Sequence, residues 1–277
     1  PLADVQLWVS GRRLTPKQVK LPAKAARPIP IGGFEHENVR SAAHGLSLNW
    51  PIAGDVIRGQ DFDTWIRRSL NDEVILNNLN KAAGTAQAIQ SSPKADDARL
   101  VAKVVMALDT SGPVRHKGFA SHIDGIGPTL AVVFQDDILR KQVEDLITSG
   151  ILKQWLALQG RVKTELMNTY GILEKIQSMV ALPGPGFGIE RCLYELNPYG
   201  HCISPMIEHL YITQSSELIP ALEAVAHDEN LPPMPIDRHV AAFLASHSEH
   251  IDERIFRPLT YKDNRPADEA LKVMRIL

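Results

Sequence analysis

The chain has 277 residues, of which 44% are hydrophobic and 22% are charged, and its formal net charge is −2. At roughly 150 residues per domain, this length corresponds to one large domain or two small ones. The apolar fraction is that of a globular protein and excludes bulk disorder. The balanced charge argues against a polybasic arm and against nucleic acid as the main partner.

The cysteine content and the hydropathy pattern bear on the cellular compartment. Cys192 and Cys202 are too few for a disulfide framework, so we expect two reduced thiols. The chain does not open on a charged region followed by an apolar stretch, and no apolar run approaches the roughly 20 residues that span a bilayer. We therefore expect a cytoplasmic protein without a membrane span. An apolar-periodic segment at residues 267–277 has no capping glycine, so we also expect the chain to be part of a longer protein.

Residues 1–60 differ in pattern from the rest of the chain. Apolar residues alternate with other side chains at residues 5–9 and 46–50, as they do in short strands. Between these segments, residues 21–34 hold three prolines and two glycines, which favour an extended surface segment. We expect residues 1–60 to form an extended N-terminal segment, with one or two short strands, that packs on the body of the protein.

Beyond this segment, apolar residues recur with helical periodicity. One stripe at three-and-four spacing covers residues 75–89, and the longest covers residues 151–182. Gly160 and Gly171 lie in the longest stripe, and each costs about 1 kcal/mol against alanine inside a helix, so we expect a kink or break at one of them. Residues 61–277 are expected to form an all-α, multi-helix bundle-like domain of about ten helices, truncated at its C-terminus.

A capping signal precedes one of the clearest stripes. Ser92 followed by Pro93 is typical of a helix start, with a capping side chain and a proline at the first helical position. The helix that it opens is expected to bury five aliphatic residues, Leu100, Val101, Val104, Val105 and Leu108.

An adjacent His227–Asp228 pair follows the predicted helix at residues 218–226. Metal-dependent phosphohydrolases of the HD type are all-helical and bind their metals with one histidine, a His-Asp pair and a later aspartate. Such ligands on a divalent ion activate water, and His209 and His250 are candidate metal ligands on either side of the pair. However, Asp228 is followed by Glu-Asn-Leu-Pro-Pro, where that class usually has a small apolar residue and glycine. A solvated helix end explains the pair more simply.

A second candidate site lies in the glycine-containing segment around His116, His122 and Asp124. Two imidazoles and a carboxylate can bind Zn²⁺ or include a general base, so His122 and Asp124 are candidate catalytic residues. The spacing is not diagnostic, and Asp124 followed by Gly125 is also an ordinary turn signal. The turn is the favoured interpretation.

A third candidate site is the glycine-rich corner formed by Gly184, Gly186 and Gly188. Glycines before a helix leave backbone N–H groups available to an anion, and Arg191 is placed to meet its charge. The segment lacks the preceding strand and the following Lys-Ser/Thr of a nucleotide-binding P-loop. Its prolines favour a rigid corner between two helices.

The remaining candidates are weaker. His247 and His250 lie three residues apart, whereas zinc sites on one helix more often use a four-residue step. Cys192 and Cys202 are possible nucleophiles, but there is no Gly-x-Ser-x-Gly elbow in the sequence. The adjacency of His201 to Cys202 carries little information, because neighbouring side chains seldom point at one another.

These observations favour a non-catalytic helical protein-interaction or regulatory module within a larger protein or complex. Its expected partner is another protein or another domain of the same chain, and no cofactor is predicted. Two alternatives remain. One is a metal-dependent phosphohydrolase of HD-like type, which would use a divalent metal at His227 and Asp228. The other is a nucleotide- or anion-sensing domain at the glycine-rich corner.

Overall fold

The protein is described by a computed structural model, which covers residues 6, 8–11, 22–159, 164–227, 235–248, 255–256 and 259. Thirteen α-helices and two antiparallel two-stranded hairpins make up this part of the chain. The expected all-α fold class is therefore confirmed. Within the same residues, no helix is both long enough and apolar enough to cross a membrane.

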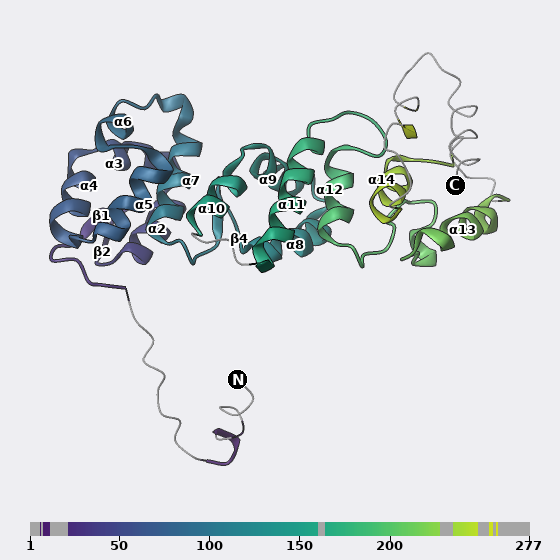
Figure 1. The fold of residues 1–277 in the computed structure, drawn as a ribbon, viewed down its shortest axis with the longest axis horizontal. Coiled ribbons are helices and arrows are strands. Elements are labelled where there is room, and N and C mark those ends of the chain that lie inside the picture. Colours follow the sequence, from purple (N-terminus) through teal and green to yellow (C-terminus); the bar gives the residue numbers. More distant parts are fainter. Residues whose placement is uncertain are drawn as a thin grey trace.

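The helices follow one another along the long axis of an elongated molecule (Figure 1). One end holds α2 (Val39–Leu48), α3 (Trp50–Arg58), α4 (Gln60–Thr64), α5 (Glu73–Ala83), α6 (Ala86–Gln90) and α7 (Asp97–Leu108). The middle holds α8 (Ile126–Val133), α9 (Asp137–Thr148), α10 (Ile151–Leu158) and α11 (Thr164–Met179), and the other end holds α12 (Gly188–Leu196), α13 (Leu218–Val225) and α14 (Arg238–His247).

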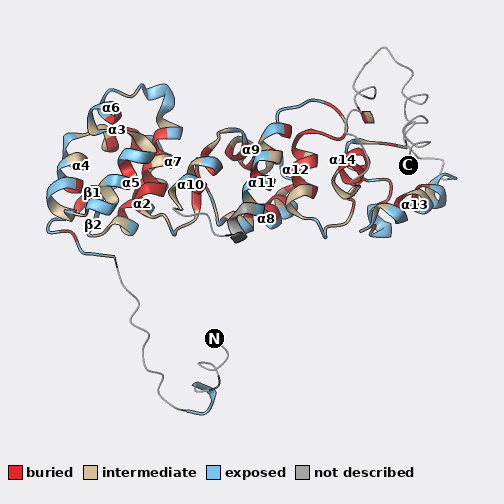
Figure 2. Ribbon diagram, viewed as in Figure 1, coloured by how far each residue is buried: buried red, intermediate tan, exposed pale blue. Residues whose placement is uncertain are grey.

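The core is divided into two clusters that meet at α7. The first cluster lies among α2–α7 and includes Leu100 and Val104, while the second extends to α14 and includes Ala102 and Met106 on another face of α7. The five residues predicted as the buried stripe of this helix are all buried. Trp50 packs against both clusters, and Figure 2 shows buried residues concentrated on helices such as α7 and α14.

Each hairpin closes through a two-residue turn with positive φ. In the first, β1 (Ile29–Ile31) and β2 (Phe34–His36) are joined by two glycines with φ of 59° and 85°. In the second, β3 (Val114–His116) and β4 (Phe119–Ser121) are joined by Lys117 and Gly118, with φ of 46° and 86°. Such turns match the twist of paired strands. The first hairpin lies where an extended surface segment was expected, and the second lies where a loop was expected.

The first sixty residues contain two short strands, β1 and β2, but the two segments predicted as strands, residues 5–9 and 46–50, are not strands where the structure describes them. Residues 46–48 end α2 and Trp50 begins α3, with Asn49 in the turn between them, and Gln6, Trp8 and Val9 are also helical. Leu46 and Trp50 are four residues apart, so the same alternation also fits a helical stripe. A capping box between Asn38 and Ser41 starts α2.

The predicted long helix is divided into α10 and α11. α11 runs through Gly171 without interruption, and Gly160 lies outside the described residues. α11 also ends at Met179, before Pro183, where its end was expected. The stripe at residues 75–89 is likewise divided into α5 and α6, because Gly84 has a φ of 93°.

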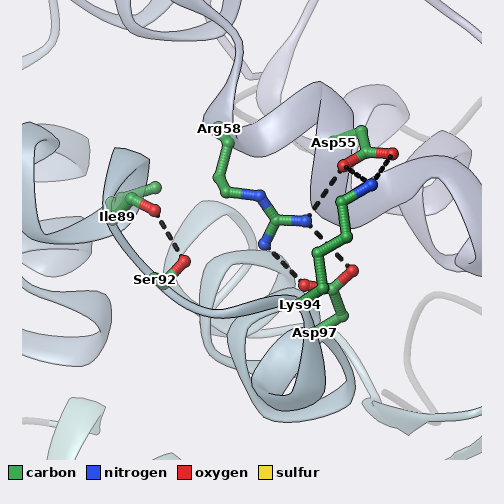
Figure 3. Close-up of polar contacts among 6 residues, drawn as sticks. All are labelled: Asp55, Arg58, Ile89, Ser92, Lys94 and Asp97. Atoms are coloured by element: carbon green, nitrogen blue, oxygen red, sulfur yellow. Dashed lines mark hydrogen bonds and ion pairs between the residues drawn. The ribbon is translucent and has the colours of Figure 1, made fainter.

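An ion cluster joins α3 to the start of α7 (Figure 3). Arg58 donates to both carboxylate oxygens of Asp97, at 2.5 and 3.1 Å, and to Asp55 at 3.0 Å. Ser92 does not cap α7, because a 3-10 turn intervenes and its hydroxyl donates to the Ile89 carbonyl at 2.6 Å. The expected start at Ser92 is therefore a few residues early.

Candidate functional site

A groove lies between the α2–α3 junction and the β3–β4 hairpin, and it encloses a cavity of about 310 Å³. We call it the α2–hairpin groove. It is lined by His44, Ser47, Leu48, Trp50, Arg115, Gly118, Phe119 and Ala120. Because Trp50 packs against both core clusters, the groove lies where the two halves of the core meet.

The local folding of α2 and β3 explains which side chains reach the groove. α2 buries a stripe that includes Ala43 and Leu46, so residues outside that stripe face away from the core. In β3, Val114 and His116 are buried, and successive side chains of a strand point to opposite sides. Arg115 lies between them and therefore points the other way, into the groove.

Arg115 is held by two side chains of α2. Its Nη1 donates to Ser47 Oγ at 2.9 Å and lies 3.1 Å from His44 Nδ1. A guanidinium can only donate, so the imidazole nitrogen is the acceptor in this contact. Nε and Nη2 of Arg115 make no hydrogen bond to any residue that the structure describes.

The rim of the groove is apolar. Leu48 is 69% exposed, and Trp50 and Phe119 supply aromatic surface beside it. Ile52, in the first turn of α3, is also exposed. A large aliphatic side chain in solvent next to a partly buried tryptophan is the kind of surface that a partner covers.

His116 lies on the other side of β3 and is only 4% exposed. Its ring meets that of Trp50 edge-on, with centroids 6.1 Å apart. Burial, helped by the charge of Lys117 and opposed by that of Asp145, lowers the pKa of His116 to about 4. The imidazole is therefore neutral near pH 7. His122 and Asp124, its proposed neighbours in a site, are both exposed.

The glycine-rich corner is covered by packed side chains. Gly184, Gly186 and Gly188 all have positive φ, as a tight corner requires. A Cβ on Gly186 would meet Phe256 at 2.9 Å, and one on Gly188 would meet Arg238 at 2.9 Å. Close packing against these side chains therefore explains why positions 186 and 188 are glycine, without an anion site.

The charged groups beside this corner have partners within the chain. Arg238 donates to both oxygens of Glu190, from Nε at 2.7 Å and from Nη2 at 2.8 Å. Burial raises the pKa of Glu190, but the hydrogen bonds and charge of Arg238, a backbone hydrogen bond and the charge of His239 together outweigh burial, so the net pKa is lowered. Arg191 is 1% exposed, and its Nε donates to Glu195 at 2.6 Å.

The other candidate ligands are described only in part. His227 and His209 are exposed, and Asp228 and His250 lie outside the described residues. In the part of the chain that the structure describes, no three histidine, cysteine or acidic side chains are close enough to share a metal ion. His247 stacks on Phe243, and its Nε2 lies 3.0 Å from a loop carbonyl oxygen.

Both thiols lie in the core. Burial raises the pKa of Cys192 to about 12 and that of Cys202 to about 11, so neither is a thiolate near pH 7. Tyr194 lies among them as a structural group, since its hydroxyl accepts from the Ile203 N–H at 3.1 Å and contacts His239 at 3.1 Å. The two cysteines and Tyr194 are therefore packed core residues, and the hydroxyl of Tyr194 has hydrogen-bond partners within the core.

Sequence reasoning missed the groove residues. His44 and Arg115 are 71 positions apart, and no short motif links them. The sequence did contain one signal, a glycine at position 118 between two short segments in which apolar and polar residues alternate. This pattern predicts a hairpin, and a hairpin would place Arg115 on its outer face. In comparisons with known proteins, no family model, no curated protein and no solved structure matches this chain.

Proposed function

We propose that this chain is a non-catalytic helical interaction module that binds a segment of a partner protein in the α2–hairpin groove. The observation that carries the proposal is the exposure of Leu48 beside Trp50 at the rim of the cavity. Tryptophan and arginine are enriched among the residues that dominate binding energy at protein interfaces, and the groove contains one of each.

The form of the groove supports a short segment as its occupant. A cavity of about 310 Å³ accommodates a few side chains rather than the broad face of a folded domain. Its walls come from a helix junction and a tight hairpin, which are both fixed by the core around Trp50. A preformed groove lowers the cost of ordering on binding, because little of this chain must rearrange.

Photo-crosslinking tests the proposal. Leu48 is replaced by benzoylphenylalanine in the full chain, and Val74, which is 67% exposed on α5, is replaced in a matched control. After irradiation in lysate of the source cells, we expect one discrete protein adduct at position 48 and none at position 74. In the Ala120→Trp background, where a large side chain fills the groove, the adduct at position 48 is expected to disappear.

Two results would overturn the proposal. One is the absence of any protein adduct at position 48. The other is an adduct whose yield is the same at positions 48 and 74, or is unchanged by Ala120→Trp, because it would report random collision rather than binding in the groove. Identification of the adduct by mass spectrometry then distinguishes a partner protein from a second copy of this chain.

A further inference from the structure

The geometry points to a carboxylate as the group that Arg115 recognises: we infer that the partner segment carries an aspartate or glutamate next to an apolar side chain. The inference rests on the proposed function and adds the chemistry of the occupant. It is carried by the arrangement of hydrogen-bond donors on Arg115, by the charge of the groove and by a second arginine in the same chain.

Arg115 keeps one complete edge of its guanidinium available. The two hydrogens of Nη1 are directed to Ser47 Oγ and His44 Nδ1, at 2.9 and 3.1 Å. The remaining hydrogens lie on Nε and Nη2, which have no hydrogen-bond partner among the described residues. Nε–H and one Nη2–H are parallel, and this edge matches the two oxygens of a carboxylate.

Another arginine of the chain binds a carboxylate through this same edge, formed by Nε and Nη2. Arg238 binds Glu190 through Nε and Nη2, at 2.7 and 2.8 Å, one bond to each carboxylate oxygen. Arg115 has the corresponding donors but no carboxylate opposite them in the described structure. An aspartate or glutamate of the partner would give Arg115 the same two-bond pair that Arg238 forms with Glu190.

The charge of the groove favours an acidic ligand. Its lining includes Arg115 and His44 and contains no aspartate or glutamate. Nearby cations are already paired: Arg40 with Asp109 at 3.5 Å, and Lys117 with Asp145 at 3.6 Å. The guanidinium of Arg115, in contrast, has no ion-pair partner among the described residues. Walls of low polarity strengthen its attraction for an anion that excludes water from the groove.

The apolar rim specifies the neighbour of the acidic residue. Leu48 and Trp50 lie on the helical wall of the groove, and Phe119 lies on the hairpin wall. An aliphatic or aromatic side chain of the partner can cover Leu48 while its acidic neighbour reaches Arg115. A free phosphate or a purely acidic peptide would leave this apolar surface in water, so it fits the groove less well.

The probe for this inference is a phage-displayed library of random short peptides, selected on the immobilised full chain. Selection on the Ala120→Trp variant, in which the groove is filled, removes peptides that bind elsewhere. We expect the enriched sequences to share an aspartate or glutamate beside a leucine, isoleucine, phenylalanine or tryptophan. The best peptide is then synthesised in two forms, with the acid and with its uncharged amide (Glu→Gln or Asp→Asn).

Affinities of the two peptide forms for three chains isolate the ion pair. On the unsubstituted chain, we expect the acid form to bind at least about tenfold more tightly than the amide form. On Arg115→Gln the two forms should bind equally, and on Arg115→Lys the ratio should be reduced because lysine has no planar fork. Arg68→Gln, which removes an exposed arginine outside the groove, should leave the tenfold ratio unchanged.

Each outcome separates the inference from the proposed function. Enriched peptides without an acid, or an acid-to-amide ratio that persists in Arg115→Gln, would overturn carboxylate recognition while leaving a peptide-binding groove. A parallel loss of both peptide forms in Arg115→Gln, with their ratio unchanged, would also overturn it, since that pattern reports a distorted groove. If selection enriches no sequence over the filled-groove variant, the inference and the proposed function both fail.

Discussion

Gly54 on α3 lies directly against the carboxylate of Asp97 on α7, so a Cβ at position 54 would overlap that carboxylate. Asp97 cannot easily move aside, because Arg58 binds both of its oxygens. We predict that Gly54→Ala destabilises the protein by about 1–3 kcal/mol, although alanine is the better helix former. Urea unfolding measures this change in the free energy of unfolding.

A second glycine supplies the matched control. Gly171 is exposed within α11, and a Cβ added there would meet nothing within 4 Å, so Gly171→Ala should stabilise by up to about 1 kcal/mol. In the Asp97→Ala background the cost of Gly54→Ala should largely vanish. A cost that persists there would show that the carboxylate is not the obstacle.

The Arg58–Asp97 pair is expected to contribute more than an exposed ion pair. The side chain of Arg58 is 12% exposed, and its removal leaves the Asp97 carboxylate partly buried without a cation. We predict a loss of about 1–2 kcal/mol for Arg58→Gln. Arg67→Gln, which breaks a more exposed pair with Asp63, should cost less than about 0.5 kcal/mol. Equal losses in the two variants would contradict this ranking.

Acid sensitivity should depend on His116. Its pKa is lowered from 6.5 to about 4 by burial, so between these values the unfolded chain binds a proton that the folded chain does not. The stabilisation from this group is complete above pH 6.5 and is lost as the pH falls toward 4, by about 3 kcal/mol in total. Urea midpoints across this range should fall less steeply in His116→Gln, while His122→Gln, at an exposed position, should follow the unsubstituted protein.

Neither thiol should react in the folded protein. Cys192 and Cys202 are fully buried, and with a pKa of about 11 even Cys202 has only about a thousandth of its thiol ionised at pH 8. Titration with Ellman's reagent should detect no fast thiol in the native state and both thiols in denaturant. A rapid stoichiometric reaction of the native protein would contradict their assignment to the core.

Periodicity was sufficient to predict the helical body, because burial between packed helices imposes it. The stripe around Val104 in α7 is an example, since its buried face follows directly from the spacing. Short alternation was misleading at Leu46, where a strand pattern of five residues also fits a helix. The hairpins were missed because Gly32 and Lys117 adopt positive φ in turns that neighbouring strands stabilise, and strands of three residues carry little periodic signal.

The groove could not be predicted from local sequence. Arg115 meets Ser47 across 68 positions, and only the packing of the hairpin beside α2 brings them together. The candidate site residues that local sequence suggested were chosen for the chemistry of their side chains, without knowledge of their burial. Arg191, for example, has an anion-binding side chain, but the fold buries it beside Glu195.

Binding in the α2–hairpin groove is tested most directly by hydroxyl-radical footprinting of the full chain, alone and with any protein that is crosslinked at position 48. We predict that Leu48 and Trp50 become protected. Tyr199 and Tyr211 are exposed in the segment between α12 and α13, at the opposite end of the molecule from α2, and should keep their oxidation rates (Figure 1). Protection of the two tyrosines with unchanged oxidation of Leu48 and Trp50 would contradict binding in the α2–hairpin groove.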